Sequence, residues 1–486
     1  MNRFSQKMNK FCDIDENQYN NSELHCYNDS KHYDQCYKKN KCDKGNKGEK
    51  GDKCDKCDKG DKVKCSKKIP IRSVPIIISL PGKYCVLNNL VYSGTGPAIT
   101  IRANNVSIDF NNHDLTLTNG SAIGIFAENV QEIEIRNDKI IQNVSPTSRV
   151  NYGIQLFNVK KVFVDNVYIT GPREAITIKD SEFIRIENSL FENNEAPCIA
   201  LISTGDVLIR YCTLSRGEHF GYFGIVVLSN FPNPGICRNI TIEHVTFNNL
   251  GSAIALTGVN DVMISNVMVN FDRTSPNFAF DAFIAAIELA DQDVTPVNNI
   301  TIRDSTFYAQ NVRTGTCGIW LGNGTNSLLE NLTIHINSQP ENANDVEGAI
   351  LIGDADPSSL LAFNNVKVSN VVISGGSHDA VAVQRGKNIT LDGLVISESD
   401  FAGVHIYPNS STITVKNSDI KNNANGVIID SGSVSNTVIN NVITNNTVHG
   451  VLINGNNNQV VNNVIANNAI NIQNNGSGNT ISPNFS

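Results

Sequence analysis

The sequence has a single tryptophan, only four methionines and no apolar run near the roughly 18 residues that a membrane-spanning helix needs. Residues 1–17 also lack the apolar core of a secretory signal. We therefore expect a protein made in the cytoplasm that either stays there or reaches an exterior surface by assembly into a particle. No apolar stripe with a 3.6-residue period lasts long enough to form a helix, which excludes helical and leucine-rich solenoids.

The most regular feature is a repeat of the form aliphatic-x-Asn-x-x-apolar, which recurs from about residue 104 to the C-terminus. Its Asn position is filled by Asn137, Asn166, Asn188, Asn266, Asn331, Asn370, Asn417, Asn440 and Asn462, and in four further copies by Tyr211, His244, Asp304 and Gly393. A second half reads Gly/Ala-aliphatic-x-aliphatic, as in Gly403 to Ile406. Several copies follow one another at short steps, 22 residues from Val164 to Ile186 and 24 from Leu391 to Val415.

Within each copy the apolar positions alternate with period two, which is typical of strands. Three short strands joined by polar bends and repeated about 14 times predict an all-β, right-handed parallel β-helix over residues 104–486. Residues 69–103 are predicted to form the N-terminal cap and the first strands. The recurrent Asn is predicted to lie at a bend, where its amide bonds the Asn of the neighbouring coil.

Residues 1–68 are different in composition: they are rich in Lys, Asp, Asn and Cys and have few aliphatic residues, which predicts disorder. They include a short Gly-X-Y run beginning at Gly45, Gly48 and Gly51, too brief to hold a collagen triple helix alone. Seven of the twelve cysteines lie here. Two interpretations stay open for the group formed by Cys42, Cys54, Cys57 and Cys65: a zinc site or disulfides.

The net charge of −8 is unevenly distributed, because residues 1–68 carry +5 and the remainder carries −13. An acidic β-helix argues against nucleic acid as a partner. It also argues against a polyanionic substrate unless calcium or a local basic patch intervenes.

One candidate site follows from aligning the second halves of neighbouring coils. The alignment gives an outward stripe with one residue per coil: Glu288, Trp320, Leu351, Ala382 and His405. An exposed Trp320 would stack on a sugar ring, with Glu288 and His405 as further glycan contacts. The alternative is that a loop folds over the indole.

A second candidate is a carboxylate pair. Glu347 and Asp379, with His378 adjacent, are predicted to lie one coil apart, about 4.8 Å between backbones. Two carboxyl groups about 5–9 Å apart are what glycoside hydrolysis needs. Asp345, Asp354 and Asp356 are candidate calcium ligands, and Arg313 and Arg385 are candidate contacts to an acidic sugar. The alternative is a solvated acidic loop with ordinary salt bridges.

The opening of the solenoid, running into Asn105 to Leu115, resembles right-handed β-helix repeat proteins such as pectate lyases, polygalacturonases and periplasmic copper-maturation proteins. That resemblance covers roughly residues 75–480 and implies the fold. The Asn-Thr-Asp and Asp-Asp motifs of polygalacturonases are absent from this sequence. The N-terminal segment more loosely resembles the Lys/Asp-rich collagen-like segments of giant amoeba-infecting viruses, which implies a place on a virion surface.

Two functions from different classes follow. The first is a non-enzymatic structural or adhesive β-helix displayed on a virion or other particle, with a polysaccharide or surface glycan as its partner. The second is a polysaccharide lyase or glycoside hydrolase that acts in the central groove through Glu347 and Asp379. No cofactor other than calcium is indicated. A homo-oligomer, such as the trimers common among β-helical surface proteins, is a further expectation.

Overall fold

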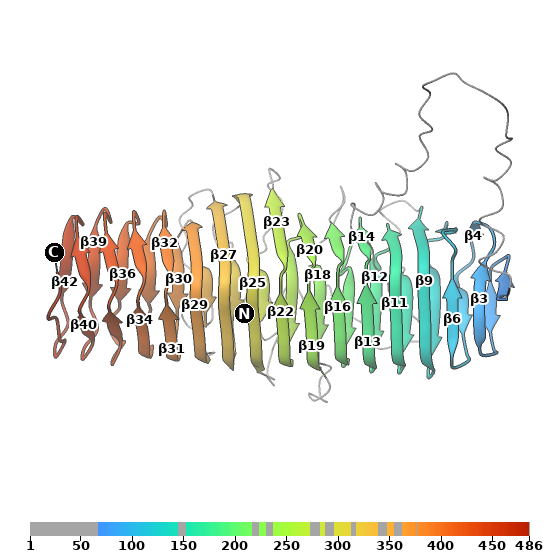
Figure 1. Ribbon diagram of the computed structural model, residues 1–486, viewed down its shortest axis with the longest axis horizontal. Coiled ribbons are helices and arrows are strands. Elements are labelled where there is room, and N and C mark those ends of the chain that lie inside the picture. The colour runs from blue at the N-terminus through green and yellow to red at the C-terminus, as the bar shows by residue number, and fades with distance from the viewer. Residues whose placement is uncertain are drawn as a thin grey trace, which may run out of the picture.

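The computed structural model describes residues 67–143, 152–215, 223–229, 237–272, 282–286, 296–312, 317–338, 348–353, 362–376 and 378–485. Within these ranges the regular elements are all strands, and every strand pairing is parallel. Coils stack one after another along a single axis from the N-terminal to the C-terminal end (Figure 1). The predicted all-β parallel β-helix is confirmed. No helix in the described ranges is long and apolar enough to cross a membrane.

One face of the solenoid is a 16-stranded sheet, here called sheet B, to which each coil contributes one strand. Its strands are β2 (Ile76–Ile78), β5 (Gly96–Ile101), β8 (Ala122–Glu128), β10 (Tyr152–Phe157), β12 (Glu174–Lys179), β15 (Ile199–Ile202), β18 (Phe223–Leu228), β21 (Ser252–Thr257), β24 (Ala282–Ala286), β26 (Cys317–Leu321), β28 (Gly348–Ile352), β30 (Asp379–Val383), β33 (Ala402–Ile406), β36 (Asn425–Ile429), β39 (His449–Ile453) and β42 (Ile470–Asn474). From β8 onward there are 14 such strands, in agreement with the number of coils expected after residue 104. Residues 69–103 add β2 and β5 in the same register.

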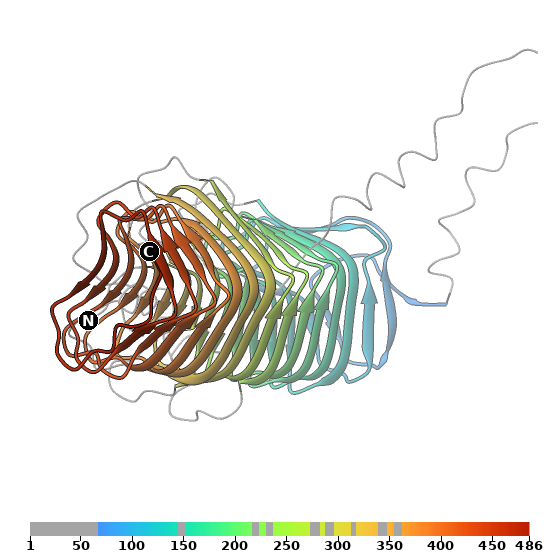
Figure 2. The ribbon, with the colours of Figure 1, turned by 60° about the vertical axis from the view of Figure 1, so that its left-hand side comes forward.

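The other two faces form a continuous 26-stranded sheet, here called sheet A. Its strands are β1 (Ile69–Ile71), β3 (Gly82–Val86), β4 (Leu90–Tyr92), β6 (Val106–Asp109), β7 (Asp114–Leu117), β9 (Gln131–Gln142), β11 (Lys160–Thr170), β13 (Glu182–Glu187), β14 (Leu190–Glu192), β16 (Gly205–Arg210), β17 (Thr213–Ser215), β19 (Arg238–Glu243), β20 (Thr246–Asn248), β22 (Asn260–Ser265), β23 (Met268–Asp272), β25 (Val297–Val312), β27 (Gly324–Ser338), β29 (Phe363–Gly375), β31 (Lys387–Asp392), β32 (Val395–Ser397), β34 (Ser411–Lys416), β35 (Asp419–Lys421), β37 (Thr437–Ile439), β38 (Val442–Thr444), β40 (Gln459–Val461) and β41 (Val464–Ala466). The oblique view in Figure 2 shows the coils nested behind one another, with a bend dividing sheet A.

That bend lies where the repeat has Asn. All nine Asn of the repeat have φ between 51° and 58°, and the substitutes Tyr211, His244, Asp304 and Gly393 are also left-handed. Asn tolerates this conformation better than most residues, which explains its recurrence. Its amide also bonds the preceding coil: Asn166 Nδ2 donates to Asn137 Oδ1 at 2.6 Å, and Asn331 donates to Asp304 at 2.9 Å. The predicted bend and ladder are confirmed.

In the last coils a second Asn follows the bend residue and points inward. Three such buried ladders run along the axis, one at each bend: Asn423, Asn446 and Asn468; Asn436, Asn458 and Asn479; Asn441, Asn463 and Asn484. The amides of these ladders bond both a neighbouring Asn of the ladder and nearby backbone groups. Asn441, for example, accepts from the Ser418 N–H at 2.9 Å and donates to the Val415 carbonyl at 2.9 Å. The buried polar groups of these bends are thereby satisfied.

Between the sheets the core is a single column of stacked apolar side chains. One ladder of sheet A runs through Phe191, Leu214, Phe247, Val269 and Phe307, all at most 2% exposed. Burying each such side chain contributes roughly 1.5–3 kcal/mol. Four of the five cysteines outside the N-terminal segment (Cys198, Cys212, Cys237 and Cys317) are free and buried, as expected of apolar thiols, whereas Cys85 is disulfide-bonded.

Candidate functional site

The outward stripe of sheet B is present, with one correction. Paired residues on successive strands are Ala285, Trp320, Leu351, Ala382, His405 and Ile428. Ala285 therefore takes the position expected for Glu288, which lies three residues further along and outside the described residues. The segment Phe283 to Ile287 is apolar throughout, so its alternation does not fix the register.

Trp320 does not lie exposed on this face. Its side chain is only 2% exposed, and its indole N–H donates to the carbonyl of Gly353 at 2.8 Å. Burying a large ring with its N–H satisfied is favourable, and it removes the ring from any sugar in solution. Of the two alternatives for Trp320, the exposed ring is contradicted and the buried indole agrees with the structure.

Asp379 lies at the start of β30, and its partner on the preceding strand is Gly348. The predicted alignment of Asp379 with Glu347 is therefore one residue out of register. Glu347 itself lies outside the described residues, as do Arg313, Asp345, Asp354, Asp356, Cys42, Cys54, Cys57 and Cys65. The catalytic, calcium, zinc and disulfide roles given to these residues stay predictions. The described part of the chain has no group of three or more His, Cys, Asp or Glu that could hold a metal ion.

The outer face of sheet B has a compact group of ionisable and aromatic residues on three successive coils, here called the His405 cluster: His378, Asp379, Phe401, His405, Tyr407 and Asp430. His405 lies between two carboxylates, with Nδ1 3.2 Å from Asp379 Oδ2 and Nε2 3.0 Å from Asp430 Oδ2. The Tyr407 hydroxyl donates to Asp379 Oδ2 at 2.9 Å, and its ring stacks on the imidazole with centroids 3.7 Å apart. The three coils are thus joined through one imidazole.

The electrostatics of this cluster follow from burial and pairing. Burial by itself lowers the pKa of His405, but its hydrogen bonds to Asp379 and Asp430 and their negative charges outweigh burial and raise the pKa to about 9. Burial raises the pKa of Asp379, yet hydrogen bonds from His378 and His405 and their positive charge hold it below its ordinary value. At neutral pH the cluster therefore holds a protonated His405 against an ionised Asp379.

The cluster is buried at its centre and reaches solvent at its edges. Asp379 is 1% exposed, whereas the side chain of Asp430 is 28% exposed and that of His378 22%. Phe401 lies at the rim, 37% exposed, with its ring centroid 4.8 Å from that of His378. Since Asp379 is buried and ionised, it cannot contact a substrate or give it a proton from this position, and both ring nitrogens of His405 are already occupied.

Asp430 and Tyr407 were not among the residues expected from sequence, although the repeat places them. Aligning Gly403 to Ile406 with Gly426 to Ile429 puts Tyr407 and Asp430 directly after the two strands, one coil apart. Arg385, the candidate contact to an acidic sugar, lies half-buried in a left-handed bend after β30. Among the described residues, no ion pair joins it to the cluster.

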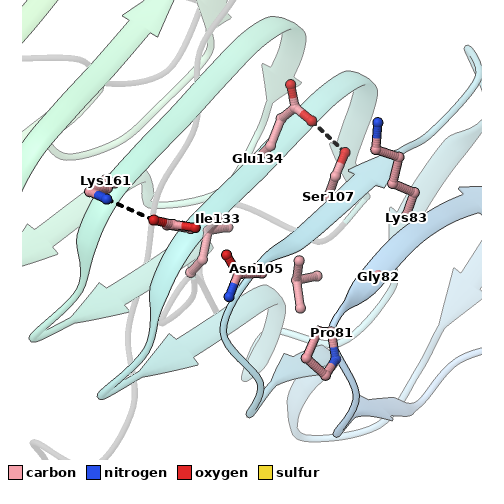
Figure 3. A pocket seen from close by; sticks show the side chains of 10 residues that line it. Pro81, Gly82, Lys83, Asn105, Ser107, Ile133, Glu134 and Lys161 are labelled. Atoms are coloured by element: carbon pink, nitrogen blue, oxygen red, sulfur yellow. Dashed lines mark hydrogen bonds and ion pairs between the residues drawn. The ribbon is translucent and has the colours of Figure 1, made fainter.

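A second surface feature is a shallow groove of about 560 Å³ on sheet A near the N-terminal end (Figure 3). Pro81, Lys83 and Asn105 line it. Two of its acidic residues are already bonded: Ser107 donates to Glu134 at 2.5 Å, and Lys161 bonds Glu132 at 2.7 Å. The groove is therefore a shallow polar surface whose carboxylates are largely engaged.

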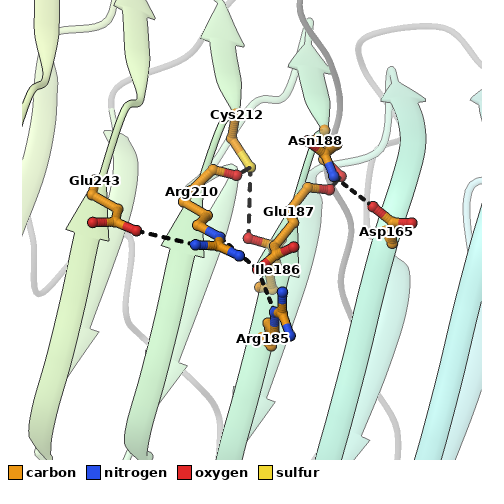
Figure 4. A network of polar contacts seen from close by, with 9 residues as sticks. Asp165, Arg185, Ile186, Glu187, Asn188, Arg210, Cys212 and Glu243 are labelled. Carbon is orange, nitrogen blue, oxygen red and sulfur yellow. Dashed lines mark hydrogen bonds and ion pairs between the residues drawn. The ribbon is translucent and has the colours of Figure 1, made fainter.

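A third feature is a charge network across β13, β16 and β19 (Figure 4). Glu187 accepts from Arg185 and, at 2.7 Å, from Arg210, which also lies 3.5 Å from Glu243. Burial raises the pKa of Glu187, but the two guanidinium groups outweigh it and hold that pKa below its ordinary value. Neutralised charges on successive coils stabilise the stack and leave no spare charge for a ligand.

Comparison with known proteins places these features in context. The sequence matches the model of the right-handed beta helix region over residues 76–233, 123–292 and 359–485. No curated protein matches it. Among solved structures it is similar to the A-module of a mannuronan C-5 epimerase from Azotobacter vinelandii, with 13% identity, 74% of this chain and 91% of that one covered, and a TM-score of 0.44.

It is also similar to a mutant tailspike protein of E. coli bacteriophage HK620 in complex with a pentasaccharide. That match has 12% identity, covers 78% of this chain and 72% of the other, and has a TM-score of 0.46. Identities and scores at this level transfer neither an activity nor a site to this chain.

Proposed function

Because the chain belongs to the right-handed β-helix family, we propose that it is a structural or adhesive rod rather than an enzyme, displayed on the surface of a virion or other particle. The observation that supports this proposal best is the uninterrupted pairing of sheet B, in which each strand bonds the next through all 16. At about 4.8 Å per coil the rod is roughly 70 Å long.

Rigidity follows from how the coils are held. Each coil contacts only its neighbours, so the stiffness of the rod depends on every interface being well packed. Apolar ladders fill the interior, and amide ladders satisfy the bends of the last coils. A stiff, soluble spacer that holds its outer faces at fixed positions suits attachment to a glycan-covered surface.

The chemistry of the His405 cluster supports the non-enzymatic role. Glycoside hydrolysis needs two carboxyl groups that both reach the scissile bond, one of them able to give a proton. Asp379 is buried and held ionised, and the imidazolium of His405 is bonded on both sides. Only Asp430 has an accessible carboxylate among the acidic residues of the cluster.

Two measurements test the proposal together. Antibodies against the chain should label the surface of intact particles, and protease treatment of those particles should remove the label. Purified protein incubated with a polysaccharide panel, with and without calcium, should release neither reducing ends nor unsaturated products. New reducing ends would favour the hydrolase, and ultraviolet-absorbing unsaturated products the lyase; either result would overturn the non-enzymatic role.

A further inference from the structure

We propose that the exposed rim of the His405 cluster, formed by Phe401, His378 and Asp430, is a binding site for an uncharged sugar ring. This inference rests on the adhesive role proposed above and names the place and the chemical class of its ligand. The class is a neutral hexose or N-acetylhexosamine unit of a glycan, and uronic acids are disfavoured.

The fold does not require ionisable residues at this place. At the same register position, the neighbouring strands β28, β30 and β36 carry Leu351, Ala382 and Ile428, all at most 3% exposed. Burying an aspartate and a histidine instead costs desolvation free energy, which a well-packed apolar side chain would avoid. Buried ionisable residues at a position that is apolar in the neighbouring coils indicate a role other than stability.

The cluster is buried at its centre and exposed around that centre, so a ligand would contact only its outer side chains. Asp379 and His405 are buried, while Asp430, His378 and Phe401 reach solvent. Oδ2 of Asp430 is fixed by His405 at 3.0 Å, and no described residue donates to its Oδ1. That oxygen is oriented and able to accept hydrogen bonds from the hydroxyl groups of a sugar.

Phe401 supplies the apolar contact. Its ring is held between His378 and His405, at centroid distances of 4.8 and 5.6 Å, so little conformational entropy remains to be lost on binding. The C–H face of a pyranose matches such a fixed aromatic ring, while its hydroxyl groups match the adjacent carboxylate.

The charge of the site selects among sugars. Asp430 presents its carboxyl group at the exposed edge of the cluster, where one oxygen is already bonded to His405. A uronate would add a negative charge beside Asp430, whereas a neutral sugar donates hydroxyl hydrogens to it.

The test uses the full chain and calorimetric titration with hexamers of glucose, galactose, N-acetylglucosamine, galacturonate and mannuronate. We expect at least one uncharged hexamer to bind and both uronate hexamers to bind at least tenfold more weakly. Phe401→Ala and Asp430→Asn should each weaken binding of the uncharged hexamer about tenfold. Val395→Ala and Asp419→Asn, at positions that also reach solvent but lie on sheet A, should leave the affinity unchanged.

The outcomes separate the site from the adhesive role. Binding that persists in both Phe401→Ala and Asp430→Asn, with the circular dichroism spectrum of the wild type, overturns this site but keeps adhesion. A preference for uronates overturns the assignment of ligand class. If no hexamer binds, both this site and the adhesive role fail, and particle labelling then decides whether the structural rod stands.

Discussion

Replacing His405 by leucine should destabilise the solenoid, and most strongly at pH values where the imidazole is charged. Leucine suits a buried position on sheet B, since the same register position holds Leu351 two coils earlier. The change removes the charged donor from Asp379, which keeps Tyr407 and His378 as neighbours. Breaking a buried ion pair by removing one partner costs about 3–5 kcal/mol. Because other donors still contact Asp379, we expect a loss of stability at the lower end of this range, about 3 kcal/mol.

The pH dependence gives the sharper test. Folding raises the pKa of His405 from 6.5 to about 9, so its contribution is fully present below about pH 6.5 and is lost as the pH rises through about 9. The difference between these two pKa values corresponds to about 3 kcal/mol of folding free energy, at 1.36 kcal/mol for each pKa unit. Asp379, Asp430, Tyr407 and the imidazole of His378 face the group. The pKa of Asp379 is held below its ordinary value, so this carboxylate stays ionised over the range.

The assay is urea-induced unfolding followed by circular dichroism at about pH 6, 8 and 10, for the wild type and His405→Leu. Other groups also titrate in this range, so the quantity of interest is the difference between the two proteins. That difference should fall from about 3 kcal/mol at the lowest pH to near zero at the highest. Ile428→Val, at the equivalent position of the next strand, is the control and should lose a constant amount of about 1 kcal/mol. If the free energies of unfolding of the wild type and His405→Leu changed in parallel with pH, the conclusion that the charged imidazole of His405 stabilises the fold would be refuted.

Three further changes probe the stack. Asn441→Ala should lower the free energy of unfolding by about 2–4 kcal/mol in urea, because it leaves the buried N–H of Ser418 and other polar groups of the ladder unpaired. Gly450→Ala should cost about 1–3 kcal/mol in the same assay, since the added Cβ would lie 2.5 Å from the carbonyl oxygen of Asn471. Glu187→Gln should cost about 1–2 kcal/mol at neutral pH. Because the pKa of Glu187 is lowered in the folded state, that cost should vanish as the pH falls well below 4.5.

The outcomes that would contradict these expectations are specific. Asn440→Gly changes the exposed residue next to Asn441, and glycine accepts its φ of 58°, so this variant should lose less than about 0.5 kcal/mol. Equal losses in Asn440→Gly and Asn441→Ala would show that the buried amides have no special role. A cost of Glu187→Gln that is independent of pH would show that packing, and not charge, explains its effect.

Much of the fold could be predicted because the residue pattern of each repeat indicates where its strands and bends lie. Alternating apolar residues define the strands, and the Asn position marks a left-handed bend in every copy, including those where Tyr211, His244 or Asp304 replaces Asn. Equivalent residues have the same structural environment in every coil. A correct assignment of strands and bends in one coil therefore predicts those of the others. The sequence could not predict that the second Asn of pairs such as Asn440-Asn441 is buried, since both look equally polar.

The site was harder to predict, for two physical reasons. Register shifts of one to three residues decide which side chains meet. The apolar segment before Glu288 and the polar segment before Glu347 both lack the alternation that would fix the register. Exposure also depends on what lies over a strand, so an outward position did not make Trp320 accessible. Three predicted residues, His378, Asp379 and His405, do lie together, although Asp379 is bonded to His405 and not aligned with Glu347.

The three buried amide ladders have a consequence for how such a chain can change over generations. Val438 and Val460 open copies that begin 22 residues apart, and each copy has an inward Asn at the same three positions. An in-frame duplication or loss of the coding segment for one whole copy would join identical bonding partners across the new junction. Such events change the reach of the molecule by about 4.8 Å each without creating a new interface. The C-terminal part of the gene can therefore lengthen or shorten in discrete steps while every intermediate product still folds.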